Sequence, residues 1–206
     1  KTEEEIAHYK MAIKINPDNA KAHSNLGNTL QKGGKNSEAI SHYKTAIQLK
    51  PDFALAHNNL GNALRREGKN SEAIPHYQKA IELKPDDYKA HNNLGVLYEE
   101  LGDTAKAIES YQTAHRIDPD NPDSLFNLGL AYDVLKDGDN SVRYMVLAKK
   151  THERKSGQDE IGRISEKLDQ LWAKYADNTK NESVASLDSN LTGDAGSPAK
   201  IYTTQT

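Results

Sequence analysis

The sequence predicts an all-α protein built from stacked antiparallel helix pairs, and three observations support this fold class. First, the six residues AHNNLG occupy positions 56–61 and return unchanged at 90–95, with the near copy AHSNLG at 22–27. Second, proline and the pair Leu-Gly each recur with a period of 34 residues. Third, the apolar residues between these landmarks follow the three-and-four spacing of helices. Together these features are typical of helical hairpins that stack into a solenoid.

One repeat, residues 54–87, shows how each pair of helices arises. A first apolar stripe predicts one helix and a second stripe predicts its partner. Gly68 lies between the stripes and suits the turn, and Pro85 ends the second helix because it lacks an amide donor. The first stripe consists of Ala56, His57, Leu60, Gly61 and Leu64, and the second of Ala73, Ile74, Tyr77, Ala80, Ile81 and Leu83.

The spacing of Leu-Gly, Ala, an aromatic residue, Ala and Pro closely resembles the tetratricopeptide repeat (TPR) family. Residues 20–53, 54–87 and 88–121 match this pattern nearly throughout, and residues 122–153 match as a divergent terminal repeat. Residues 1–19 match only the second helix of an incomplete repeat. The resemblance implies a right-handed superhelical solenoid that binds other proteins or peptides.

Both ends of the array depart from the repeat. Residues 159–176 carry a further apolar stripe, which predicts a capping helix over the last hairpin. At the N-terminus the first helix of the pair is missing, so we expect Ile6, Tyr9 and Ile13 to form an uncovered apolar edge. Either a helix upstream in the native protein or a neighbouring molecule would cover it.

The last residues, 178–206, have a low-complexity composition that predicts a tail which is extended or disordered unless bound. Ile201 and Tyr202 give its end the character of a segment that docks in extended form, so they join the N-terminal stripe as candidates for self-assembly. Asn181 and Asn190 fit the glycosylation sequon, but such triplets arise by chance in tails of this composition.

An asparagine ladder lies opposite the core stripe of the first helices. Asparagine forms helices poorly, so its repetition there calls for an explanation. A primary amide carries two donors and an acceptor, and it can therefore bond both groups of a peptide backbone. The arrangement is similar to the asparagine-lined groove in the repeats of O-linked N-acetylglucosamine transferases. The alternative is that recent duplication copied these residues together with everything else. The candidate peptide-binding asparagines are Asn25, Asn59, Asn93 and Asn127, with Asn28 and Asn62 one turn on.

The same surface carries a predicted charge gradient. Its first half is basic and its second half acidic, with Lys89 as an exception. Such a gradient would orient a bound segment. The tail has Asp188 and Asp194 before Lys200, so charge alone lets it serve as a ligand for a neighbouring subunit. The basic candidates are Lys21, Lys32, Arg65 and Arg66, and the acidic ones are Glu99, Glu100 and Asp133.

The composition argues against other classes of function. The net charge of −3 gives no basic field for nucleic acid, and no apolar run approaches a membrane span. The chain has no cysteine, and most of its eight histidines follow the repeat on separate hairpins, so we expect neither a metal nor a cofactor. We find no catalytic constellation. Localisation stays open.

These observations predict a non-catalytic scaffold that binds an extended peptide in a concave groove. One alternative is a structural subunit that forms head-to-tail filaments through its N-terminal helix and its tail. A second alternative is a regulatory fragment of a larger transferase.

Overall fold

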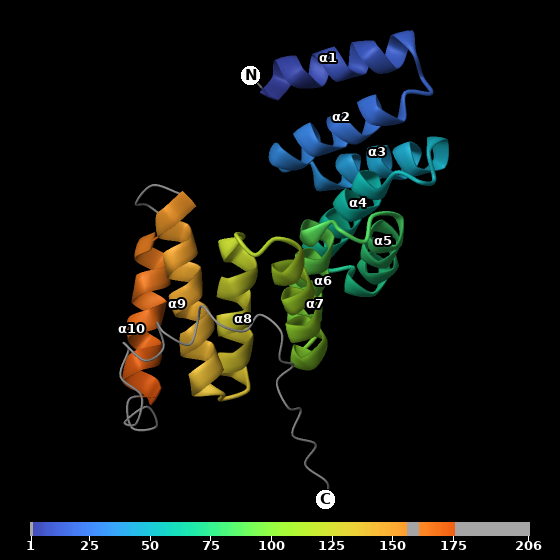
Figure 1. The fold of residues 1–206 in the computed structure, drawn as a ribbon. Helices are drawn as coiled ribbons and strands as arrows, with labels where there is room; N and C mark the ends of the chain where they lie inside the picture. Colours follow the sequence, from blue (N-terminus) through green and yellow to red (C-terminus); the bar gives the residue numbers. More distant parts are fainter. Residues whose placement is uncertain (1, 156–160, 176–206) are drawn as a thin grey trace, which may run out of the picture.

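The computed structural model describes residues 2–155 and 161–175, which form ten helices and no strand (Figure 1). The helices are α1 (Thr2–Ile15), α2 (Ala20–Lys32), α3 (Asn36–Leu49), α4 (Ala54–Arg66), α5 (Asn70–Leu83), α6 (Tyr88–Glu100), α7 (Thr104–Ile117), α8 (Pro122–Val134), α9 (Gly138–Lys155) and α10 (Ile161–Tyr175). The predicted all-α fold class is confirmed.

Consecutive helices pack as hairpins, α2 with α3, α4 with α5, α6 with α7 and α8 with α9. Each second helix also packs on the first helix of the next pair, so the hairpins form one right-handed superhelical solenoid. Figure 1 shows α1 at one end and α8, α9 and α10 side by side at the other.

The turn inside each hairpin requires a left-handed backbone. Gly34, Gly68 and Gly102 have φ angles of 77°, 73° and 78° at equivalent places. The predicted role of Gly68 as a turn residue is thus confirmed. In the last hairpin Lys136 takes this conformation with φ of 59°, although a side chain there is disfavoured.

The two helices of a hairpin touch where a glycine faces a tyrosine ring. A Cβ atom on Gly27 would lie 2.6 Å from Tyr43 Cε1, and one on Gly61 would lie 2.8 Å from Tyr77 Cε1. Both tyrosines are fully buried. The Leu-Gly landmark is therefore explained by the space that a ring from the second helix occupies. In α8, Gly129 instead faces Met145.

The N-terminal helix corrects one sequence-based expectation. Ile6, Tyr9 and Ile13 are half-buried against the core that α2 and the following helices form, and so they do not make an uncovered edge. The reason is that α1 packs on α2 as every second helix packs on the next repeat. The exposed apolar residues of α1 are Met11 and Ile15, whose exposed fractions are 58% and 78%.

The capping helix α10 covers α9. Its inner face contributes Ile164, Leu168, Leu171 and Tyr175 to a core shared with α8 and α9. Asp133 at the end of α8 accepts hydrogen bonds from Lys167 (3.2 Å), Lys174 (2.6 Å) and the Tyr175 hydroxyl (2.9 Å). Partial burial disfavours the charge, but these three donors outweigh it and hold the pKa of Asp133 below its ordinary value.

Candidate functional site

The asparagines of the first helices are joined in pairs between successive repeats. Asn93 Nδ2 donates to Asn58 Oδ1 at 3.0 Å, and Asn127 Nδ2 donates to Asn92 Oδ1 at 3.2 Å. Asn59 Nδ2 donates to Asn28 Oδ1 at 2.8 Å. The asparagines thus link α2 to α4, α4 to α6 and α6 to α8.

Asn59 bonds a residue at a different repeat position from the partners of Asn93 and Asn127. The residue equivalent to Asn58 and Asn92 in the first full repeat is Ser24, whose side chain is too short to meet Asn59. The Ser24 hydroxyl is buried and has no partner among the described residues. Asn59 therefore turns to Asn28, one helical turn further along α2.

The buried tyrosines orient two of these asparagines. Tyr43 donates its hydroxyl to Asn28 Oδ1 at 2.7 Å, and Tyr77 donates to Asn62 Oδ1 at 2.8 Å. Burial raises the pKa of Tyr77 to about 12, so the donor proton stays in place at neutral pH. Each tyrosine ring packs against the glycine of its hairpin, and its hydroxyl bonds an asparagine on the side of the first helix that carries the ladder.

In the third full repeat Val96 replaces this asparagine. Tyr111 donates instead to Glu99 Oε2 at 2.8 Å. Burial, reinforced by Glu99, raises the pKa of Tyr111.

Each asparagine pair leaves one unused donor group and one unused acceptor. Because Asn93 donates through Nδ2, its Oδ1 has no partner among the described residues, while Asn58 retains its Nδ2 group. The pair of Asn127 and Asn92 has the same polarity. An extended peptide presents N–H and C=O groups in alternation, so such pairs match its backbone.

The pairs line a hollow of about 350 Å³ over α4, α6 and the start of α8. Four of the lining residues were predicted from the sequence, namely Asn59, Asn62, Asn93 and Lys89. Six were not predicted, namely Leu55, Asn58, Tyr88, Asn92, Asn121 and Asp123. The first asparagine of AHNNLG was the missed signal, because it occurs in two successive repeats, as Asn58 and Asn92.

Several candidate charges are already engaged. Arg65 forms an ion pair with Glu100 of the next repeat, and Glu99 accepts the Tyr111 hydroxyl. Lys89 lies over the Tyr88 ring at 5.8 Å from its centroid. The ion pair joins a residue of the predicted basic half, Arg65, to one of the predicted acidic half, Glu100.

The remaining candidates lie outside the hollow. Asp133 is occupied by the capping helix, while Lys21, Asn25, Lys32 and Arg66 are exposed on α2 and α4. Asn127 is half-buried and reaches the site through its bond to Asn92. The tail candidates Ile201 and Tyr202 lie outside the described residues.

The repeated histidines form pairs of their own. His23 Nδ1 and His42 Nδ1 lie 3.1 Å apart, and His57 and His76 repeat the contact at 3.2 Å. The described residues contain no group of three or more histidines and carboxylates placed to hold a metal ion. None of the described helices combines the length and apolarity needed to cross a membrane.

Comparison with known families decides the assignment. The family model described as TPR repeat matches residues 1–34, 32–66, 61–102 and 100–133. The chain belongs to the TPR family. No curated protein is similar enough to this TPR chain to count as a match.

Solved structures with the same fold include several TPR proteins. The crystal structure of MamA is 31% identical, with a TM-score of 0.67, over 73% of this chain and 88% of that one. MamA 41-end from Desulfovibrio magneticus RS-1 is 19% identical, with a TM-score of 0.68, over 76% and 88%. YrrB, a TPR protein described as having an unusual peptide-binding site, is 20% identical, with a TM-score of 0.64, over 81% and 84%. A role in protein interaction follows from the family.

Proposed function

We propose that this TPR protein is a non-catalytic scaffold that binds an extended peptide segment along the asparagine pairs of α4, α6 and α8. The observation that carries the proposal is the unused donor and acceptor of each pair, for example Asn58 Nδ2 and Asn93 Oδ1. Both groups belong to side chains held by other bonds, so little conformational freedom is lost when a peptide binds. YrrB, a TPR protein with an unusual peptide-binding site, supports this proposal.

The lining of the hollow adds a preference to this backbone recognition. Leu55 and the Tyr88 ring supply apolar surface, and Lys89 and Asp123 supply one charge of each sign. A peptide with an apolar side chain between an acidic and a basic residue matches this set. The amide pairs provide sequence-tolerant contacts, and these four side chains set the register.

Peptide display on the immobilised full chain, followed by fluorescence polarisation with the selected peptides, tests the proposal. Asn59→Ala with Asn93→Ala should weaken binding at least about tenfold, since two or more backbone bonds are lost. The matched control is Gln48→Ala, which removes an exposed amide from the second helix α3 and should leave affinity unchanged.

Backbone recognition has a further signature in the peptide. N-methylation of backbone amides should weaken binding more than replacement of most side chains by alanine, because it removes the donors that the asparagine carbonyls accept. Equal affinity of the double variant and the wild type, with helicity intact, would rule the groove out.

A second candidate function, head-to-tail self-assembly, rests on the exposed apolar residues of α1. Met11 and Ile15 lie four residues apart on one side of that helix and are largely exposed. Sedimentation of the wild type against Met11→Lys with Ile15→Lys tests it. A wild type that stays monomeric at high concentration would exclude assembly through α1.

A further inference from the structure

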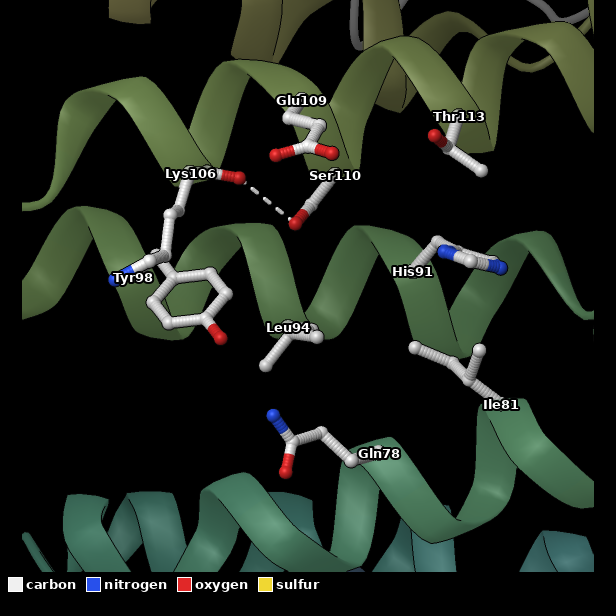
Figure 2. Close-up of a pocket in the computed structure, with 9 residues that line it drawn as sticks. All are labelled: Gln78, Ile81, His91, Leu94, Tyr98, Lys106, Glu109, Ser110 and Thr113. Atoms are coloured by element: carbon white, nitrogen blue, oxygen red, sulfur yellow. Dashed lines mark hydrogen bonds between the residues drawn. The ribbon is translucent and has the colours of Figure 1, made fainter.

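A second hollow, of about 320 Å³, lies between α5, α6 and α7 (Figure 2). On α6 it is lined by His91, Leu94 and Tyr98, whereas the groove is lined by Lys89, Asn92 and Asn93. At 100° per residue these two sets lie on opposite sides of the helix. The second hollow is therefore distinct from the proposed peptide groove.

One residue distinguishes this part of the array from the earlier repeats. Position 110 is serine, whereas the equivalent position in each of the remaining units carries an aromatic ring, as His8, His42, His76 and Tyr144. Ser110 donates its hydroxyl to the carbonyl of Lys106 at 2.8 Å, on its own helix, and does not reach His91 (Figure 2). The ring that contacts the first helix of the hairpin through His42 and His76 in the two earlier repeats is missing here.

The histidine pairs of the two earlier repeats indicate which chemical group could occupy the hollow beside Ser110. His57 Nε2 bonds the carbonyl of Pro51 at 3.1 Å, so this nitrogen carries the proton and Nδ1 carries the lone pair. His76 must then donate its Nδ1–H to His57 Nδ1, at 3.2 Å. His23 and His42 repeat the arrangement through the carbonyl of Pro17.

His91 makes the same bond through Nε2, but no histidine from the second helix faces it. Its Nε2 bonds the carbonyl of Pro85 at 3.0 Å, which leaves Nδ1 as an acceptor with no partner among the described residues. Figure 2 shows Leu94 between His91 and Tyr98 along α6, so an apolar floor adjoins the acceptor. A planar ring with one N–H donor fits both features.

We propose that the hollow beside Ser110 binds a histidine side chain from a partner protein, whose ring N–H donates to His91 Nδ1. The partner ring would take the place that His42 and His76 occupy in the earlier repeats. The lining carries the ammonium of Lys106, 5.4 Å from the Tyr98 ring centroid, and the carboxylate of Glu109, so it has no net charge that would favour an arginine or lysine over a neutral ring. The site would give the scaffold a second partner on the face opposite the groove.

The first test uses 4-methylimidazole as a probe of the side chain, at pH 8, where the neutral form of the ring predominates. Amide chemical shifts of residues 91, 94, 98 and 110 should move and saturate, with a Kd on the order of 10 mM. The comparison ligand is 1-methylimidazole, which has a similar shape but no N–H donor. It should bind about fivefold more weakly. Equal binding of the two ligands, or no saturable shift up to 100 mM probe (roughly ten times the expected Kd), overturns the proposal.

Two variants of the full chain sharpen the result. Ser110→His should fill the hollow from within and abolish the shifts, whereas Ser110→Ala keeps the hollow and should retain binding. If Ser110→His folds and still shows the same shifts, the probe binds elsewhere and the proposal fails. The comparison of the two ligands on the wild type decides the question even if Ser110→His does not fold.

Peptide display then tests the partner. Peptides selected on the wild type and depleted on Ser110→His should share a histidine, and replacement of that histidine by alanine should abolish binding. These peptides should still bind the Asn59→Ala, Asn93→Ala variant, which separates this site from the groove. A selected set without histidine contradicts the proposal.

Discussion

Asn93 donates its side-chain amide to Asn58 Oδ1 across 3.0 Å, and so joins the first helices of two successive repeats. The bond lies at the surface that carries the ladder, where the exposed fraction of Asn58 is only 5%. The asparagines therefore have a structural role as well as the binding role proposed for them.

A double-mutant cycle should reveal this bond in the free energy of unfolding. We expect Asn58→Ala and Asn93→Ala to couple by about 0.5–1.5 kcal/mol, as a partly buried neutral hydrogen bond does. Urea denaturation of the wild type, both single variants and the double variant measures the coupling. Strictly additive effects would show that this bond contributes nothing to stability.

Gly61→Ala should destabilise the protein by about 1–3 kcal/mol, because its Cβ would lie 2.8 Å from Tyr77 Cε1 in a packed core. The free energy of unfolding from urea titration measures this. Gly162→Ala is the control, since nothing lies within 4 Å of a Cβ there. That change should be neutral or stabilising by up to about 1 kcal/mol. Equal effects at the two sites would contradict the packing argument.

Pro75→Ser should stabilise the protein by about 1–3 kcal/mol. Pro75 lies inside α5, where it cannot donate to the carbonyl of Ser71. The equivalent residue in α3 is Ser41, so serine is compatible with the packing. Thermal unfolding measures the gain, and the reverse change Ser41→Pro should lower stability. A Pro75→Ser variant less stable than the wild type would refute this reading.

Stability should fall as the pH drops below about 6.5, in part because of the histidine pairs. Burial lowers the pKa of His42, and His23 and Lys10 lower it further while Glu38 raises it. Burial likewise lowers the pKa of His76, with His57 and Lys44 adding to the effect and Glu72 opposing it. The unfolded chain therefore binds protons first, so the stabilising contribution is complete above the ordinary value of 6.5 and is lost below it.

The measurement compares unfolding free energies at pH 7.5 and pH 5. His42→Ser with His76→Ser, which copies Ser110 into both earlier repeats, should flatten the pH dependence. His8→Ser, at the exposed equivalent place in α1, is the control and should leave it unchanged. A double variant with the slope of the wild type would exclude the pairs as its source.

Asp133→Asn should loosen the capping helix. It removes the charge that Lys167 and Lys174 contact, so amides of residues 161–175 should exchange at least about tenfold faster while α2 to α7 stay unchanged.

Because the pKa of Asp133 is lowered in the fold, the same loosening of α10 should appear in the wild type as the pH falls below the ordinary value of 3.8. Glu166→Gln, an exposed change on α10, is the control. Unchanged exchange in α10 would show that apolar packing alone holds this helix.

The sequence by itself determined the repeating hairpin. The period of 34 residues, the turn at Gly68 and the two apolar stripes of a repeat all depend on contacts within one hairpin. Such contacts are local, and helical periodicity together with residue size is enough to predict them. The position of the asparagines on one face of the first helices follows from the same periodicity.

Only the tertiary structure decided how the polar groups are used. Asn59 bonds Asn28, 31 residues away, while Asn93 bonds Asn58, 35 residues away. Asp133 turns to Tyr175, 42 residues further along the chain. These contacts join helices from different units of the array, so the packing of one unit on the next decides which partner lies within reach. The distance along the sequence does not select it. The hollow beside Ser110 also depends on tertiary structure. Its lining residues come from α5, α6 and α7, and these three helices meet only in the folded array.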